Sequence, residues 1–265
     1  MNIGGRDFAT LLRGPGQRGN WIALVNMLGS YERPLGAFRR YLLASGTYPH
    51  VFTLRSPAGP VRVTAYSHDD LLTINEIFCR RDYPIRPTDR VVVDFGSNIG
   101  ISALYFLTHA PDCFVHCHEP LPSNCDRLRK TLQGYERRYH LAPCAISVEE
   151  GCVDFAYEPT GRYGGIGEVG GIGIRSSGTM AVSALRARDV IAGILKSRAR
   201  IDVLKIDIEA MERDVLLSLP KSQLERIDRI YVELRFDSNP LLETHAFQQY
   251  GLVAQFRNKN WRKTG

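Results

Sequence analysis

A continuous apolar run that ends in an acid and leads straight into a glycine-rich turn constrains this fold most. Residues 91–95 read VVVDF, and the turn Gly96-Ser-Asn-Ile-Gly100 precedes an apolar segment with helical spacing at 101–110. A short apolar run of this kind is typical of a strand buried on both faces of a parallel sheet. Strand, glycine turn and helix together predict an α/β protein.

The same alternation of apolar strands and amphipathic helices continues to the end of the chain. It predicts a mostly parallel Rossmann-like sheet with helices on both faces. We expect strands in 114–119, 140–147, 152–158, 180–186, 201–209, 229–236 and 251–256. We expect helices in 122–135 (capped by Ser123 or Asn124), 187–197, 210–219 and 240–250.

The first 88 residues differ in pattern from the rest. Segments 21–30 and 35–45 have helical spacing, and 50–66 reads as a hairpin around Pro57-Ala-Gly-Pro60. Segment 69–81 reads as a helix with Asp69 or Asp70 near its N-cap. We therefore predict a helical and hairpin lead-in at 1–88, packed on a core domain at 89–265. The amphipathic first 45 residues are candidates to pair subunits into a homo-oligomer.

Composition narrows the class of protein. The sequence holds no apolar run of the roughly 18 residues that a membrane span needs, and its start lacks the apolar core of a signal peptide, so we expect a cytoplasmic protein. The six cysteines form no CxxC pair and no set with zinc-ligand spacing. We predict reduced, mostly buried thiols and no structural metal.

The two ends of the chain are basic, each carrying +4 in residues 1–50 and 257–265. A basic surface is a feature of nucleic-acid-binding proteins, so an RNA methyltransferase is one alternative. The sequence lacks the Asn/Asp-Pro-Pro-aromatic motif that amino-directed nucleic-acid methyltransferases tend to carry. We therefore favour solvated basic ends and expect no nucleic-acid partner.

Ligands in open α/β sheets bind beyond the carboxyl ends of the strands. The turn after Asp94 opens a helix, whose free N–H groups favour a carboxylate or phosphate, and Asp94 could reach a ligand amine or a bridging water. Glu119 ends the next predicted strand, where a carboxylate can accept hydrogen bonds from both ribose hydroxyls. This order of features predicts a nucleotide-cofactor site.

Residues 165–170 also match the dinucleotide fingerprint G-x-G-x-x-G, which raises the alternative of a nicotinamide-dependent dehydrogenase. The match lacks its context, because no buried strand enters it and no helix opens from it. We read it as accidental, and we take the glycine-rich stretch 161–178 as a candidate lid over the substrate.

The stretches VVVDFGSNIG, HCHEPLPSNCDRLRKTL and VLKIDIEAMERDVL together resemble the FkbM-type methyltransferases, over roughly residues 50–235. These are class I S-adenosylmethionine-dependent enzymes that mostly methylate hydroxyls of polyketides, sugars and glycolipids. The resemblance implies a methionine-side contact by the glycine turn, a ribose contact by Glu119, and adenine contacts by the third strand's end. The implied cofactor-binding residues are Asp94, Gly96, Ser97, Asn98, Gly100, Glu119, Ala145, Ile146 and Ser147.

Two departures from the family pattern affect this assignment. The family usually has an Asp after the third strand, where this chain reads Ser147-Val148, so Glu149 or Glu150 is the substitute for the adenine amine contact. The family also usually has Gly-Ala where this chain has Ala210-Met211. We favour a core position for Met211 over one on the substrate side.

Methyl transfer to an alcohol needs close positioning of the acceptor and a base to take its proton. The acids Asp207, Glu209 and Glu233 are predicted at strand ends on the active edge. Glu209 is our first candidate for the base and Asp207 the second. In an alternative that we do not favour, these three carboxylates bind Mg²⁺. A non-catalytic cofactor-binding module, in which these acids are dispensable, is the remaining alternative.

Overall fold

The computed structural model describes residues 2–3, 6–7, 18–157, 164–166, 178–209 and 211–261. The chain divides into two compact units, Met1–Pro84 and Ile85–Gly265. This division falls close to the predicted boundary at 88/89. The packing of the lead-in on the core stays a prediction.

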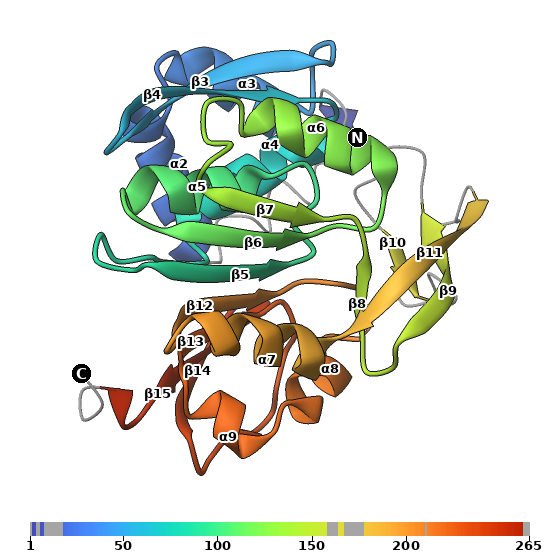
Figure 1. Ribbon diagram of the computed structural model, residues 1–265. Helices are drawn as coiled ribbons and strands as arrows, with labels where there is room; N and C mark the ends of the chain where they lie inside the picture. Colours follow the sequence, from blue (N-terminus) through green and yellow to red (C-terminus); the bar gives the residue numbers. More distant parts are fainter. Residues whose placement is uncertain are drawn as a thin grey trace. The chain divides into compact units, whose positions relative to one another are not determined.

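The described part of the first unit consists of short helices and two small antiparallel strand pairs (Figure 1). Two-residue strands β1 (Asn2–Ile3) and β2 (Arg6–Asp7) pair with each other. Helices α2 (Arg18–Ser30) and α3 (Pro34–Leu43) confirm the helical reading of this region. Strands β3 (His50–Ser56) and β4 (Gly59–Ala65) form the predicted hairpin. Ile22, Val25 and Leu28 are exposed on α2, and pairing of subunits through these helices stays a prediction.

The third helical segment begins earlier than we predicted. Helix α4 (His68–Ile74) continues into a π-helix, η2 (Asn75–Arg80). Its N-cap is Ser67, whose hydroxyl accepts from the Asp70 N–H while the Asp70 carboxylate accepts from the Ser67 N–H at 3.0 Å. This is a capping box in which Asp70 is the third-position acid, so Asp69 and Asp70 lie near the N-cap as we predicted, and the cap itself is Ser67.

The second unit is built on a seven-stranded sheet with the order β14-β15-β13-β12-β5-β6-β7. The five adjacent strands from β13 to β7 in this order are parallel. They are β5 (Val91–Phe95), β6 (Phe114–His118), β7 (Tyr139–Ala142), β12 (Ile201–Ile206) and β13 (Ile227–Val232). Strands β14 (His245–Tyr250) and β15 (Val253–Asn258) add an antiparallel edge. This confirms the predicted Rossmann-like, mostly parallel sheet.

Helices cover both faces of this sheet, as the fully buried strand β5 requires. Helix α5 (Ile101–His109) lies on the face to which Asp94 points, since Ser102 of α5 hydrogen-bonds Asp94. Helix α6 (Pro122–Thr131) packs on α5. Helices α7 (Ala187–Ser197), α8 (Glu212–Ser218) and α9 (Lys221–Leu224) cover the other face.

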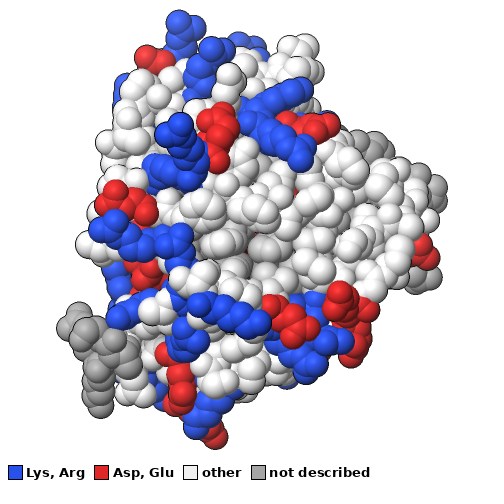
Figure 2. All heavy atoms as spheres, in the orientation of Figure 1, with Lys and Arg blue, Asp and Glu red and all other residues white. Residues whose placement is uncertain are grey.

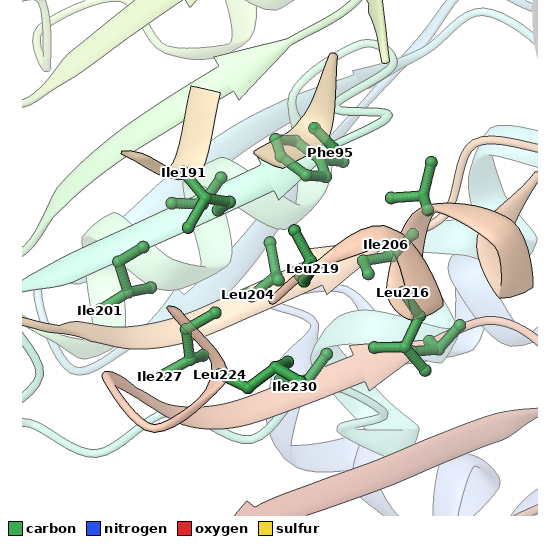
Figure 3. Close-up of a cluster of buried hydrophobic side chains, with 14 of the residues drawn as sticks. Phe95, Ile191, Ile201, Leu204, Ile206, Leu216, Leu219, Leu224, Ile227 and Ile230 are labelled. Carbon is green, nitrogen blue, oxygen red and sulfur yellow. The ribbon is translucent and has the colours of Figure 1, made fainter. Parts of the chain in front are cut away.

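The main core lies between that second helical layer and the sheet (Figure 3). Phe95 of β5, Ile191 of α7, Leu204 of β12 and Leu216 of α8 all point into it. Each of these four side chains is buried, and truncating a buried leucine to alanine typically costs about 2–5 kcal/mol. These contacts pack β5 and β12 against the helices α7 and α8.

The predicted third strand, 140–147, is two strands in two different sheets. Pro143 separates β7 from β8 (Ala145–Ser147), and the Cys144 N–H closes a tight turn onto the Ala142 carbonyl at 2.9 Å. Proline cannot donate to the strand ladder, so pairing breaks at this residue. Ala145, Ile146 and Ser147 therefore leave the main sheet and pair in parallel with β11.

The second sheet of this unit has the order β10-β9-β11-β8. Its antiparallel part consists of β9 (Gly151–Tyr157), β10 (Gly164–Ile166) and β11 (Gly178–Arg186). Figure 1 shows it at the edge toward which the parallel strands point. We refer to β8–β11 below as the small sheet.

Two further sequence expectations are wrong. Segment 240–250 is not a helix, because a turn closed by His245 N–H to the Leu241 carbonyl leads into β14, which pairs with β15 along its whole length. Helix α6 is not capped by Ser123 or Asn124. Its N-cap is Leu121, and Pro122 takes the first helical position, where its missing N–H costs nothing.

All six cysteines are free thiols, and all but Cys152 are buried, as we predicted. No helix in the described ranges combines the length and the apolar character that a bilayer span requires.

Candidate functional site

Four acids lie at the carboxyl ends of four neighbouring strands. Asp94 is the penultimate residue of β5, and Glu119, Asp207 and Glu233 directly follow β6, β12 and β13. The order β13-β12-β5-β6 places them along one edge of the sheet. This is the edge where α/β sheets bind ligands.

The glycine turn after β5 is held tightly against its neighbours. The N–H groups of Gly96 and Ser97 both donate to the His118 carbonyl, at 3.1 and 3.0 Å. Gly96 has φ +79°, and a Cβ at this position would overlap the carbonyl oxygen of Asp207. A side chain is excluded here both by backbone conformation and by space, which explains the glycine.

Lys205 is a buried ammonium group that joins three parts of the site. Its Nζ lies 3.2 Å from Asp94 Oδ1 and 3.0 Å from Asp207 Oδ2, and it donates to the Gly96 carbonyl at 2.9 Å. Lys205 and Asp94 are register partners on adjacent parallel strands, so their side chains point to the same face. Lys205 and Asp94 are both buried, whereas Asp207 is partly exposed.

Charge balance at this point depends on the lysine. Burial of the Lys205 ammonium by itself would lower its pKa, but the carboxylates of Asp207 and Asp94 outweigh burial and raise the pKa above its usual value. Lys205 therefore stays charged. The Asp94 carboxylate is occupied inside the protein, because its Oδ2 also accepts from the Ser102 hydroxyl at 2.6 Å.

Glu119 is a buried carboxylate surrounded by donors. Its Oε2 accepts from the Asn98 N–H at 3.0 Å, and its Oε1 accepts from the Leu121 N–H at 3.0 Å and from Asn124 Nδ2 at 3.2 Å. Burial raises the pKa of Glu119 to about 7, although these three donors act in the opposite direction. The Asn98 contact ties the glycine turn to the end of β6.

The N-terminus of α5 opens directly from the glycine turn. Its N-cap is Gly100, with φ +85°, which has no side chain to cap the helix. The first-turn N–H groups of a helix have no intrahelical partner and carry the positive end of the helix dipole. These groups are suited to bind an anionic group such as a carboxylate.

The loop after β12, residues 207–209, carries two of the predicted catalytic acids. The Asp207 N–H donates to the Phe95 carbonyl at 3.1 Å, and the Ile208 N–H donates to Glu212 Oε1 at 3.2 Å. Glu209 has φ +56°, a left-handed conformation that is unusual for a residue with a side chain. We call residues 207–209 the acid loop below.

The predicted adenine-side residues lie on the small sheet. Ala145, Ile146 and Ser147 of β8 are buried, and Ala145 packs with Leu121, two residues after Glu119. The Ser147 hydroxyl accepts from the Glu149 N–H at 3.2 Å. The Glu149 carboxylate is mostly exposed and pairs with Arg186 at 3.3 Å.

Reasoning from the sequence missed three residues that shape the site. Lys205 was not among the predicted site residues, because its place beside Asp94 depends on the register between β12 and β5. Ser102 and Glu212 were not identified. Glu212 is buried, and burial raises the pKa of its carboxyl group, but no local pattern distinguishes it from a surface acid at the start of a helix.

Strand β6 also carries two histidines, His116 and His118, close to the end that holds Glu119. His118 is buried with its ring edge-on to Phe95, at 5.1 Å between centroids. Burial lowers the pKa of His118 to about 3 and that of His116 to about 4. Both rings are therefore neutral near pH 7.

The literal G-x-G-x-x-G match does not form a strand–turn–helix where the structure describes it. Gly165 lies within β10, which pairs antiparallel with β9. Gly167, Gly170 and most of the predicted lid 161–178 lie outside the described residues. Among the residues that are described, there is no group of three or more His, Cys, Asp or Glu side chains arranged to hold a metal ion.

A family model described as the methyltransferase FkbM domain matches residues 94–257. The AMB antimetabolite synthetase AmbE of Pseudomonas aeruginosa is 29% identical over 203 residues, which cover 64% of this chain and 9% of that protein. The 31-O-demethyl-FK506 methyltransferase FkbM of Streptomyces tacrolimicus is 28% identical over 215 residues, covering 69% of this chain and 82% of that protein.

Similarity to solved structures is weaker. A methyltransferase from Geobacter sulfurreducens is 14% identical with a TM-score of 0.37, covering 65% of this chain and 72% of that one.

Proposed function

This chain belongs to the FkbM methyltransferase domain family, and from that premise we propose that it transfers the methyl group of S-adenosylmethionine to a hydroxyl group of a small molecule. The observation that carries the proposal is the close packing of Gly96 on Asp207. This packing brings the glycine turn, which is suited to bind a cofactor, against the acid loop. Both lie at the edge where α/β sheets bind ligands.

The residues at this edge fit the cofactor by chemistry. The uncapped N-terminus of α5 suits the carboxylate of the methionine part, next to Gly96, Ser97, Asn98 and Gly100. Glu119 suits the two ribose hydroxyls, because further donors would stabilise a buried carboxylate whose pKa is raised to about 7. When bound, S-adenosylmethionine supplies an electrophilic methyl group on a sulfonium sulfur.

The adenine base of the cofactor is proposed to lie beside strand β8. Ala145, Ile146 and Ser147 are proposed to flank the base, since β8 packs beside Leu121 and hence near Glu119. Glu149 is held by Arg186 on the surface, so we favour the Ser147 region over Glu149 for contact with the adenine amine.

Asp94 is proposed to position other residues of the site and not to contact the cofactor directly. Its carboxylate binds Ser102 and Lys205 inside the protein. Through Lys205 it fixes Asp207 and the carbonyl of Gly96. We therefore propose that Asp94 positions the glycine turn and the acid loop relative to each other.

Glu209 is the proposed base that accepts the proton of the acceptor hydroxyl. Asp207 lies 3.0 Å from the Lys205 ammonium, so we propose that its carboxylate serves mainly to position the acid loop. Glu209 is therefore the first candidate for the base, and Glu233, after β13, is the next. A positioned base contributes typically about 10²–10⁴-fold to such a reaction.

The acceptor is proposed to be a hydroxyl of polyketide, sugar or glycolipid type. One relative is described as an O-demethyl-FK506 methyltransferase, which supports an oxygen acceptor on a small molecule. On the face shown in Figure 2, Lys and Arg side chains are interspersed with Asp and Glu. Exposed ion pairs such as Arg186–Asp189 and Lys221–Glu243 also occur in the described residues. Such mixing of charges supports solvated basic groups over a nucleic-acid surface.

The proposal is tested by incubating the protein with S-adenosylmethionine labelled in its methyl group and a panel of hydroxylated acceptors, read by mass. A labelled product that forms with the wild type, and at least about a hundredfold more slowly with Glu209→Gln, supports it. Labelling of RNA but of no small hydroxylated compound would overturn the choice of acceptor.

A further inference from the structure

Gly165, in the glycine-rich stretch, lies in close contact with the acid loop. It is buried, and a Cβ at this position would lie 3.1 Å from the carbonyl oxygen of Glu209 and 3.4 Å from its Cβ. The first of these distances is shorter than normal carbon–oxygen van der Waals contact. A side chain at position 165 would therefore require Glu209 or β10 to move by a few tenths of an ångström.

Glu209 needs such support because its backbone is strained. A left-handed φ of +56° in a residue with a side chain costs roughly 1 kcal/mol or more and persists only where neighbours hold it. Its loop is fixed on the sheet side, where Asp207 N–H binds the Phe95 carbonyl and Ile208 N–H binds Glu212. On the other side, the backbone of Gly165 lies close to Glu209 itself.

The small sheet also reaches the cofactor side of the site. Gly165 pairs with Ala156 of β9, and β9 pairs with β11 along its length. Phe155 of β9 and Val182 of β11 pack with Leu121, whose N–H binds Glu119. The small sheet thus contacts both the proposed base and the segment after the proposed ribose acid.

We infer that Gly165 is a positioning residue for the methyl transfer, which holds Glu209 at a fixed place relative to the cofactor turn. Gly165 acts through Glu209: the missing side chain lets β10 lie against the loop without displacing the carboxylate. This inference rests on the proposed function of Glu209 as the base. It assigns a role to the glycine-rich stretch that differs from binding a dinucleotide.

The test compares Gly165→Ala with Gly151→Ala, a control in the same sheet where no described atom lies within 4 Å of the added Cβ. The protein is labelled with ¹³C in the glutamate carboxyl groups, and the Glu209 signal is assigned by its loss in Glu209→Gln. We expect Gly165→Ala to shift this signal and its titration midpoint, and Gly151→Ala to leave both unchanged. A Glu209 signal that is the same in both variants overturns the inference.

Kinetics give a second readout with any acceptor that the panel identifies. Gly165→Ala is expected to lower kcat by at least tenfold, with KM for S-adenosylmethionine within twofold of wild type. Equal losses in both glycine variants would contradict a positioning role. If no acceptor is methylated, the proposed function fails, whereas the carboxyl signal still decides whether Gly165 positions Glu209.

If Gly165→Ala does not fold, the double variant Gly165→Ala/Glu209→Gly provides the test. Glycine at 209 has no Cβ and accepts the left-handed conformation. It therefore removes the 3.4 Å contact and the backbone strain, and leaves a loop that can shift its carbonyl oxygen away from the added methyl group. Recovery of folding in the double variant supports the inference, and failure of both variants to fold overturns it.

Discussion

Gly96 packs so closely on Asp207 that a single added methyl group would occupy the position of the Asp207 carbonyl oxygen. The two residues lie 111 positions apart in the chain, at the ends of the adjacent strands β5 and β12. The turn that is proposed to hold the cofactor and the loop that carries the proposed base are therefore packed directly against each other.

Gly96→Ala is expected to lower the free energy of unfolding by about 1–3 kcal/mol for overpacking, plus roughly 1 kcal/mol for left-handed strain. The matched control is Gly134→Ala, since Gly134 has φ +93° but the described residues leave its added Cβ without an atom within 4 Å. Urea unfolding of both variants checks the prediction. Equal destabilisation by the two would show that the clash with Asp207 does not matter.

Lys205→Met is expected to destabilise the protein strongly. It leaves the buried carboxylate of Asp94 without its cation, and removing one partner of a buried pair costs about 3–5 kcal/mol. The double variant Lys205→Met/Asp94→Asn should recover part of this loss, because the uncompensated charge is gone. Urea unfolding measures the free energy of unfolding of these variants. A value for Lys205→Met equal to that of the wild type would contradict the prediction.

Glu119 is expected to make stability depend on pH. Its pKa is about 7 in the folded protein and about 4.5 in the unfolded chain, so between these values the folded state holds a proton that the unfolded state releases. The free energy of unfolding therefore falls as pH rises from about 5 to 7.5, by an amount on the order of a few kcal/mol. Glu119→Gln should lack this component.

The same titration predicts proton release on cofactor binding. Hydrogen bonds from the ribose hydroxyls favour the ionised carboxylate, so binding lowers the pKa of Glu119 and expels its proton. Calorimetry with S-adenosylmethionine at pH 6 in buffers of different ionisation enthalpy measures this release. Proton uptake, or the same release in Glu119→Gln, would contradict the assignment.

Glu209→Gln is expected to affect mainly turnover, and Asp207→Asn is expected to affect mainly stability. Glu209→Gln should lower turnover by about 10²–10⁴-fold with little change in stability, as expected for loss of a base. Asp207→Asn should lower stability first, because Lys205 loses a partner at 3.0 Å. Parallel turnover and unfolding measurements distinguish the two, and unchanged turnover in Glu209→Gln would remove Glu209 from the chemistry.

Local patterns were enough to predict the parallel sheet and the edge where the acids meet. Apolar runs that end in Asp94, Glu119 and Asp207 identify strands and their carboxyl ends, because strand periodicity and burial are encoded locally. Contacts between strands were harder to predict. Lys205 becomes central only when register with Asp94 is known.

The errors arose where a tertiary partner overrides local spacing. Segment 240–250 has apolar residues at helical intervals, yet β15 offers an antiparallel partner and β14 forms instead. Pro143 was inside a predicted strand, although proline is disfavoured within a sheet, and that signal correctly marks the break between β7 and β8. The contact of Gly165 with Glu209 could not be predicted, since it joins two sheets.

The central claim is that S-adenosylmethionine binds at the Gly96 turn and Glu119. Calorimetric titration of the wild type, Glu119→Ala and Gly167→Ala tests it most directly. The account predicts binding by the wild type, loss on the order of a hundredfold in Glu119→Ala, and nearly unchanged affinity in Gly167→Ala. Full affinity in Glu119→Ala with loss in Gly167→Ala, or binding of NADH in place of S-adenosylmethionine, would contradict it.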